Sequence, residues 1–171
     1  MLKPQDVVIL LKIAAMGVST WQYSFLAKEL CMSASEVHAG FRRLEHAHLA
    51  DSQSKQPIFP ALEEFLIHGI RYVFPAEIGE LTRGIPTSHA TEPLNNFLVK
   101  TQGPPPVWPC AEGNTRGYSF LPLYKSVPDA AMKDSFFYEL LALVDAIRGG
   151  KARERQLAIR ELKKRLNPRT L

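Results

Sequence analysis

Apolar residues recur at helical spacing in the first part of the chain. Pro4 suits the first turn of a helix, and the segment 7–14 is apolar over more than half of the helical circumference. This pattern predicts a largely buried first helix that ends at Gly17. The segment 18–20 is then expected to be a short strand or connector, with Trp21 packed beneath it.

The stretch 21–49 predicts two short helices joined by a tight turn at Cys31 and Met32. Ser33 is a good N-cap for the second helix, and Glu36 three residues later completes a capping box. The inward stripe of the first helix is predicted to be Phe25, Leu26 and Leu30. The buried face of the second helix is predicted to be Val37, Phe41 and Leu44.

The outward face of the second helix is polar and basic. In a helix-turn-helix, this outward face of the second helix is the one that enters the major groove. The segment LAKELCMSASEVHAGFRRLEHAHLA resembles bacterial winged-helix transcription regulators, MarR-like ones most of all, over roughly residues 4–60. The resemblance implies a winged helix-turn-helix that binds double-stranded DNA. The predicted DNA-binding residues are Ser33, Ser35, His38, Ala39, Arg42, Arg43 and Lys55. Arg43 has an alternative role, which is to brace the fold by pairing with an acid such as Glu45 or Glu29.

A short wing is expected after the second of these helices. Segments 48–51 and 56–59 are predicted to pair as strands around a loop whose one cation is Lys55. Pro60 then begins a helix that runs to about Gly69. Its predicted apolar face is Leu62, Phe65, Leu66 and Ile70.

The middle of the chain, residues 71–125, contains most of the prolines and glycines. It also keeps large apolar residues such as Trp108 and Phe120, so we interpret it as an ordered arm wrapped over the domain or over its dimer mate. The residues 112–116 are predicted to form a hairpin turn between segments 107–108 and 118–120.

The last part of the chain predicts an αα-hairpin. Asp134 caps a helix that ends at Gly149 and Gly150, and a second helix runs from about Lys151 to Leu166 before Asn167 and Pro168 stop it. The apolar stripe of the first helix is Phe137, Leu140, Leu141, Val144 and Ile147. The second helix is predicted to place Leu157, Ala158, Ile159, Leu162 and Leu166 inside. The expected fold is therefore mostly α, with a winged helix-turn-helix at 1–70, the arm at 71–125 and the helical hairpin with a basic tail at 126–171.

Composition adds a charge asymmetry to this picture. With 46% hydrophobic and 22% charged residues, the chain has the composition of an ordinary globular protein. Residues 148–171 carry nine basic residues, Arg169 among them, against two acidic ones, whereas the first 147 residues are net acidic. A basic tail favours either a polyanion contact or a solvated terminal helix. We expect no membrane span, no signal peptide and a cytoplasmic location.

Candidate catalytic or metal chemistry is weak. His46 and His48 face apart on a helix, and the two cysteines have no zinc spacing. Thr87, Ser88 and His89 lie in a turn but lack the arrangement of a nucleophile with its base. Cys110 is interpreted as an inert thiol rather than a redox sensor. We therefore expect no catalytic residues, no metal and no cofactor.

Together these patterns predict a DNA-binding transcription regulator that acts as a homodimer and occupies a pseudo-palindromic operator. The alternative is a protein-interaction module, such as an antitoxin-like regulator whose proline-rich arm binds and neutralises a partner protein. The apolar arm favours the second reading, and Arg42 with Arg43 favours the first.

Overall fold

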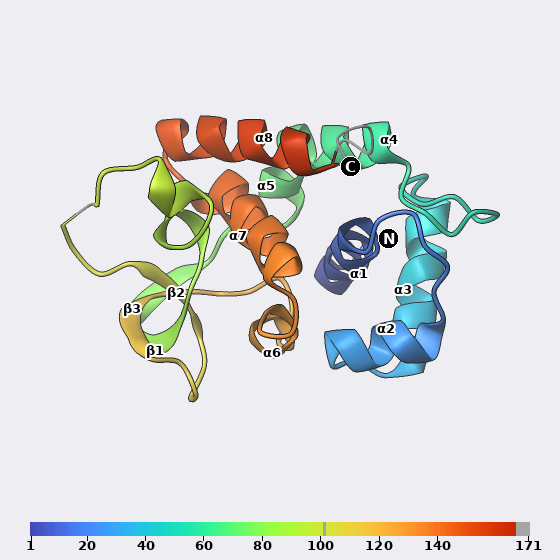
Figure 1. Ribbon diagram of the computed structural model, residues 1–171, viewed down its shortest axis with the longest axis horizontal. Helices are drawn as coiled ribbons and strands as arrows, with labels where there is room; N and C mark the ends of the chain where they lie inside the picture. The colour runs from blue at the N-terminus through green and yellow to red at the C-terminus, as the bar shows by residue number, and fades with distance from the viewer. Residues whose placement is uncertain (101, 167–171) are drawn as a thin grey trace.

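Helices dominate the fold, and one small sheet of three strands joins them (Figure 1). The computed structural model describes residues 1–100 and 102–166. The helices are α1 (Pro4–Ala15), α2 (Tyr23–Leu30), α3 (Ala34–His46), α4 (Phe59–Glu64), α5 (Ile70–Val73), α6 (Val127–Ala131), α7 (Ser135–Gly149) and α8 (Ala152–Leu166). The strands are β1 (Ile78–Pro86), β2 (Pro106–Pro109) and β3 (Thr115–Phe120). The short turns are a π-helix η1 (Phe65–Gly69) and the 3-10 helices η2 (Ser88–Ala90) and η3 (Leu94–Asn96).

Helix α7 lies in the middle of the molecule, with α1 to α3 on one side and the strands on the other (Figure 1). Every residue from 140 to 148 is buried, so this helix is covered on all faces rather than on one stripe. Asp134 caps it by accepting the backbone N–H groups of Phe136 and Phe137 at 3.1 Å. The predicted αα-hairpin of α7 and α8 is confirmed, and its first helix is also the core of the whole fold.

Helix α1 follows the prediction and packs between α3 and α7. Lys12 is buried, and its ammonium group contacts the carboxylates of Asp134 at 2.7 Å and of Glu29 at 3.4 Å. Burial raises the pKa of Asp134, but the hydrogen bonds from Lys12 and Phe137 outweigh it, so that pKa lies below its ordinary value. One cation therefore ties α1 to α2 and α7.

The segments around the predicted wing are less regular than expected. Residues 18–20 form no strand, and the two predicted wing strands reduce to a single bridge between Ala50 and Pro57. The residues between them form a tight turn, since the Asp51 carboxylate accepts the Ser54 N–H at 2.6 Å. That local hydrogen bond turns the chain before a ladder can extend. The wing strands were thus predicted too long.

The helix predicted at 60–69 runs further than expected, through α4, η1 and α5 to Val73. Its buried residues are Leu62, Leu66 and Ile70, whereas Phe65 is only partly buried. Phe65 is the first residue of the π-helix and packs against the core with only part of its side chain buried.

The predicted hairpin of segments 107–108 and 118–120 is wrong. Strands β2 and β3 each pair antiparallel with the longer β1, and they lie parallel to each other, so the sheet closes on itself. This closure requires close approach of the backbones. A Cβ at Gly117 would lie 2.0 Å from the Pro105 carbonyl oxygen, so only glycine fits there.

A buried polar cluster fixes the sheet to α7. The Asp145 carboxylate accepts hydrogen bonds from the Thr87 hydroxyl and the Trp108 indole, each at 2.7 Å, and pairs with Arg148 at 2.8 Å. Arg148 also donates to the Phe74 carbonyl oxygen. Burial raises the pKa of Asp145, and the Arg148 guanidinium opposes that rise. The described residues of 71–125 are thus packed on their own chain, and one hydrophobic core contains residues of all three predicted regions.

The second helix of the hairpin buries Ala158, Leu162 and Leu166, with Leu157 and Ile159 partly buried beside them. The predicted stop at Asn167 and Pro168, and the cation Arg169, lie outside the described residues. Within 1–100 and 102–166, none of the helices has the length and apolar character needed to cross a membrane.

Candidate nucleic-acid interface

The turn between α2 and α3 has the predicted form. Cys31 ends α2 in a left-handed conformation with φ of 54°, and Ser33 begins α3. The Ser33 hydroxyl accepts the Glu36 N–H at 3.1 Å, and the Glu36 carboxylate accepts the Ser33 N–H at 2.8 Å. The capping box is therefore confirmed. It also engages the Ser33 hydroxyl, which was predicted to contact DNA.

The inward face of α3 packs against α1. Val37, Phe41 and Leu44 are fully buried, as predicted. Gly40 lets the two helices approach, because a Cβ there would lie 2.5 Å from the Ile9 side chain and 2.9 Å from the Asp6 carboxylate. With that face fixed, the exposed face of α3 presents Ser35, His38, Ala39 and Arg42.

Arg43 was predicted to face outward, and this is wrong. Its guanidinium donates two hydrogen bonds, each of 2.8 Å, to the carboxylate of Asp6, which is completely buried on α1. The hydrogen bond to Asp6 raises the pKa of Arg43. The bracing role left open by the sequence is therefore the observed one, although the partner is neither Glu45 nor Glu29.

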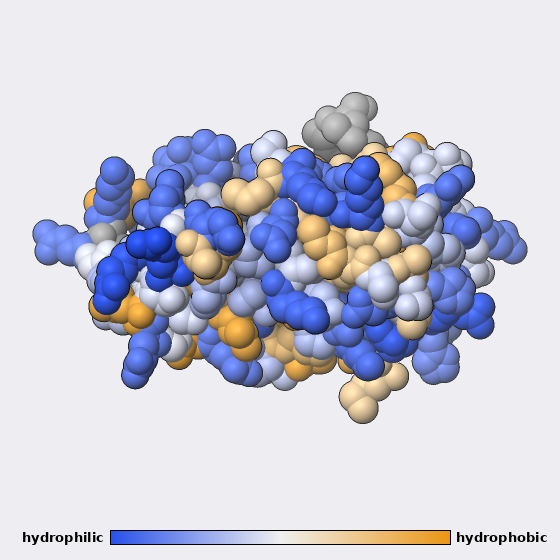
Figure 2. Space-filling view, turned by 90° about the horizontal axis from the view of Figure 1, so that it is seen from below, coloured by the Kyte–Doolittle hydropathy of each residue, from blue (hydrophilic) through white to orange (hydrophobic). Residues whose placement is uncertain are grey.

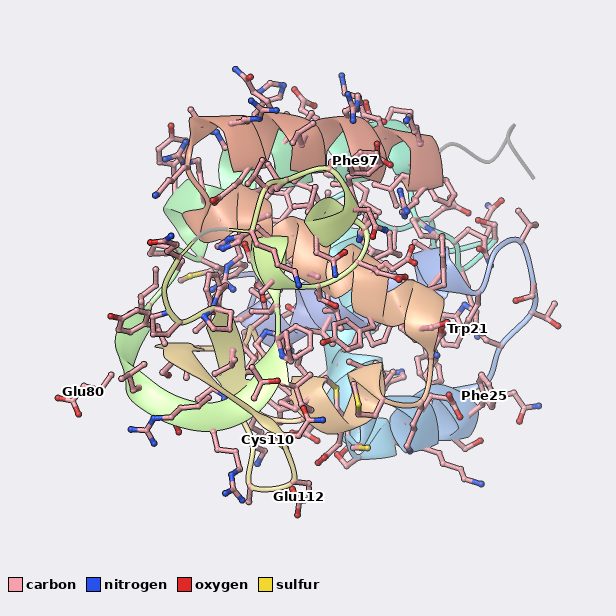
Figure 3. The ribbon with its side chains drawn as sticks, turned by 60° about the vertical axis from the view of Figure 1, so that its left-hand side comes forward. Trp21, Phe25, Glu80, Phe97, Cys110 and Glu112 are labelled. Atoms are coloured by element: carbon pink, nitrogen blue, oxygen red, sulfur yellow. The ribbon has the colours of Figure 1, made fainter. Side chains whose placement is uncertain are left out.

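Phe25 was predicted to point inward, but its side chain is 48% exposed. It precedes Leu26 by one position, about 100° around the helix, and the buried stripe of α2 runs through Leu26, Ala27 and Leu30. Phe25 lies at the end of the molecule with Trp21 (Figure 3). Figure 2 shows the face that carries α2 and α6, where hydrophobic residues form small groups among hydrophilic ones.

Lys55 contacts two aromatic rings, those of Trp21 and Tyr23. Its ammonium group lies 5.5 Å from the ring centre of Trp21 and 5.1 Å from that of Tyr23, and its carbonyl oxygen accepts the Trp21 indole N–H at 2.9 Å. Tyr23 also meets the His38 ring edge-on, with the two ring centroids 5.0 Å apart. Lys55 and His38, 17 positions apart in sequence, therefore belong to one surface.

Helix α3 also carries two acidic residues, Glu36 and Glu45. Arg42 is 70% exposed and lies 3.7 Å from the Glu45 carboxylate. Glu36 accepts the Tyr124 hydroxyl at 2.7 Å, and together with the Ser33 N–H this contact holds the pKa of Glu36 below its ordinary value. We call Ser35, His38, Ala39, Arg42 and Lys55 the α3 face. Of its two formal cations, Arg42 has an acidic neighbour in Glu45.

Sequence reasoning missed two residues that shape the α3 face. Tyr23 links His38 to Lys55, and its only sequence signal is an aromatic residue two positions after Trp21. Asp6 is the other, a lone acid in an apolar helix. A buried carboxylate requires a partner, and that requirement was a signal that a distant cation such as Arg43 turns inward.

The chain matches no protein-family model, no curated protein and no solved structure. The assignment of a function therefore depends on the geometry of the site.

The other candidate catalytic side chains, Thr87, His89 and Cys110, already contact carboxylates within the chain. His89 pairs through Nδ1 with Glu154 at 3.5 Å, and the Thr87 hydroxyl is taken by Asp145. The Cys110 thiol lies 3.4 Å from the Glu112 carboxylate, which is the wrong charge to stabilise a thiolate. In the part of the chain that the structure describes, no three His, Cys, Asp or Glu side chains gather to hold a metal ion.

Proposed function

We propose that α1 to α3 and the loop after them form a winged helix-turn-helix that binds double-stranded DNA and regulates transcription. The observation that carries this proposal is the division of α3 into two faces. Val37, Phe41 and Leu44 are fully buried, and the opposite face presents Ser35, His38, Ala39 and Arg42 to solvent. A helix held in this way at the edge of a domain has the shape that the major groove admits.

Each exposed side chain has a defined part in this proposal. Arg42 donates two hydrogen bonds to the edge of a guanine, and the methyl group of Ala39 contacts a thymine methyl. Ser35 and His38 hydrogen-bond to a base or phosphate. Lys55, held over Trp21 and Tyr23, contacts the phosphate backbone beside the groove. Arg43 is assigned no DNA contact, because Asp6 already engages its guanidinium.

The protein acts as a homodimer on a pseudo-palindromic operator. Two copies of α3 then lie in successive major grooves, about 34 Å apart. Occupancy of such a site blocks access to it, and this is the simplest way to regulate transcription.

Selection from a random duplex library tests the proposal. The full chain is expected to enrich an inverted repeat whose half-sites are about one helical turn apart. Sedimentation of the protein with the enriched duplex is expected to give two chains per duplex. Recovery of no common sequence after repeated rounds contradicts the proposal.

A second candidate function is binding of a partner protein. One observation favours it: three large apolar side chains of the sheet, Ile78, Leu81 and Tyr118, are exposed, and so is Leu121 directly after β3. The antitoxin-like reading drew on the arm, whose Trp108 and Phe120 are instead buried within the chain. These four exposed residues are therefore the surface that we propose for such a partner. Selection of no DNA sequence would place this function first.

A further inference from the structure

Helix α8 presents a row of cations on the side opposite to its buried face. Ala158, Leu162 and Leu166 are buried, whereas Arg153, Arg160, Lys163 and Lys164 are exposed. These four positions differ by 7, 3 and 1 residues, so they lie on one side of a helix of 3.6 residues per turn. We call these four residues the α8 basic face.

The two acidic residues of α8 are turned inward. Glu154 is buried, accepts the backbone N–H of Lys151 at 2.9 Å and pairs with His89. Glu161 is buried too. Its carboxylate contacts Arg160 at 3.3 Å, Lys164 at 3.1 Å and Arg165 at 2.9 Å. One buried carboxylate, that of Glu161, is thus shared by three cations. The outer surface of the helix therefore keeps a net positive charge.

In the residues that the structure describes, two members of the α8 basic face, Arg153 and Lys163, pair with no carboxylate. A third, Arg160, holds its guanidinium 5.5 Å from the ring of Phe97, which is itself exposed. Figure 3 shows Phe97 beside α8, with nitrogen-bearing side chains projecting from the helix away from the rest of the molecule.

We infer that the α8 basic face binds the sugar–phosphate backbone of nucleic acid without regard to sequence. From Arg153 to Lys164 the helix extends about 16 Å, and a duplex carries one negative charge per about 1.7 Å of its axis. A row of cations of that length faces several phosphates at once. A surface that served only solubility usually mixes both signs, but the acids of this helix are buried.

A lipid surface fits the same helix less well. Helices that bind membranes at the interface bury an apolar face between the headgroups. The apolar face of α8 is already buried against α7 and α4, so only the charged side is free. Contact with phosphates along a nucleic acid needs no free apolar face.

This inference is independent of whether α3 binds DNA. Helix α8 runs along one long side of the molecule and α3 lies at one end (Figure 1), so the two faces address different stretches of nucleic acid. Binding by α8 is electrostatic and independent of sequence, whereas the role proposed for α3 is a preference for particular bases.

The test uses the full chain and a short duplex of arbitrary sequence, with fluorescence anisotropy measured over a range of salt concentrations. The variant carries Arg153→Gln, Arg160→Gln, Lys163→Gln and Lys164→Gln, because glutamine keeps helix propensity without charge. We expect at least a tenfold loss of affinity at low salt. We also expect the salt dependence of log Kd to flatten by up to about 0.9 per lost phosphate contact.

A matched control removes four exposed cations elsewhere through Lys3→Gln, Arg83→Gln, Lys100→Gln and Arg116→Gln. It has the same net charge as the α8 variant and is expected to retain most of the affinity. A lighter variant, Arg153→Gln with Lys163→Gln, leaves the contacts of Glu161 intact. It is expected to show about half of the change in salt dependence, so the test survives if the fourfold variant fails to fold.

Three outcomes overturn the inference. The α8 variants bind the duplex with the affinity and salt dependence of the parent, the control loses as much as the α8 variant, or the parent binds phosphatidylserine vesicles but not the duplex. Loss of sequence preference in an α3 variant, with the salt dependence kept, leaves the inference standing. The two proposals therefore fail separately.

Discussion

The α3 face and the α8 basic face are both exposed helix surfaces, but they differ in how their charges are arranged. On the α3 face, Lys55 is held over Trp21 and Tyr23, His38 meets Tyr23, and Arg42 lies near Glu45. On the α8 basic face, four cations project from a helix whose acids are buried. The first surface carries two cations, and its side chains are positioned by aromatic and acidic neighbours. The second carries four cations, two of which contact the buried Glu161 carboxylate.

This difference matches two separate demands of nucleic-acid binding. Phosphate contacts supply affinity and salt dependence but carry no sequence information, whereas base contacts require side chains in fixed positions. With two cations the α3 face offers few phosphate contacts, whereas the four exposed cations of the α8 basic face offer more of them. In our proposal, α3 provides specificity and α8 provides affinity.

The largest expected effect comes from the core beneath the α3 face. Phe41→Ala removes a fully buried ring and is expected to cost about 3–5 kcal/mol of folding free energy, with DNA binding lost as a consequence. Chemical denaturation measures the loss. Phe25→Ala is the matched control, because Phe25 is half exposed and is expected to change stability far less. Equal losses for the two variants would contradict the observed orientation of α2.

Arg43→Ala is expected to have the next largest effect. It leaves the Asp6 carboxylate buried without its cation, which is expected to cost about 3 kcal/mol of folding free energy. The neighbouring Arg42→Ala is the control, since Arg42 is mostly solvated. If Arg43→Ala instead abolished DNA binding at unchanged stability, Arg43 would belong to the α3 face after all.

Arg42→Ala should separate binding from folding. We expect a loss of about 1–3 kcal/mol in binding to the preferred duplex and relaxed preference at one base pair per half-site. The melting temperature should hardly move, because a substitution on an exposed helix face usually changes stability by within about 0.5 kcal/mol. Anisotropy and thermal melting on the same samples check both statements. A drop in melting temperature with binding intact would make Arg42 a structural residue.

The smallest expected effect is a dependence on pH beneath the α8 basic face. Burial raises the pKa of Glu161, but Lys164 and Arg165 outweigh burial, so its folded pKa lies below the ordinary value of 4.5. Its contribution to stability is therefore present above pH 4.5 and is lost as the pH falls through the folded pKa. The difference in melting temperature between the parent and Glu161→Gln should shrink below pH 4.5. A difference that stays constant with pH would argue against this ionised contact.

Local signals in the sequence predicted much of the α3 region and less of the remainder. The capping box of Ser33 and Glu36 depends on residues three positions apart, so it was visible directly. The pairing of Arg43 with Asp6 spans 37 positions and was missed, because the periodicity of α3 alone does not show what α1 presents to it.

The middle region was the hardest to predict, for a related reason. Strands β2 and β3 lie close in sequence and suggested a hairpin, but each finds its main partner in β1. The position of α7 at the centre also depends on contacts from distant segments, including the bonds of Asp145 to Thr87 and Trp108. The apolar stripe of α7 indicated one buried face, whereas elements remote in sequence cover the others.

The most direct test of the proposed function compares the preferred duplex from selection with a scrambled duplex over a range of salt concentrations. We measure the parent, Arg42→Ala and the fourfold α8 variant. Our account predicts that Arg42→Ala lowers the ratio of the two affinities by about tenfold or more and changes the salt dependence by about one contact at most. The α8 variant should keep the ratio and flatten the salt dependence. If Arg42→Ala keeps the affinity ratio of the parent, α3 does not read DNA and the proposed function is wrong.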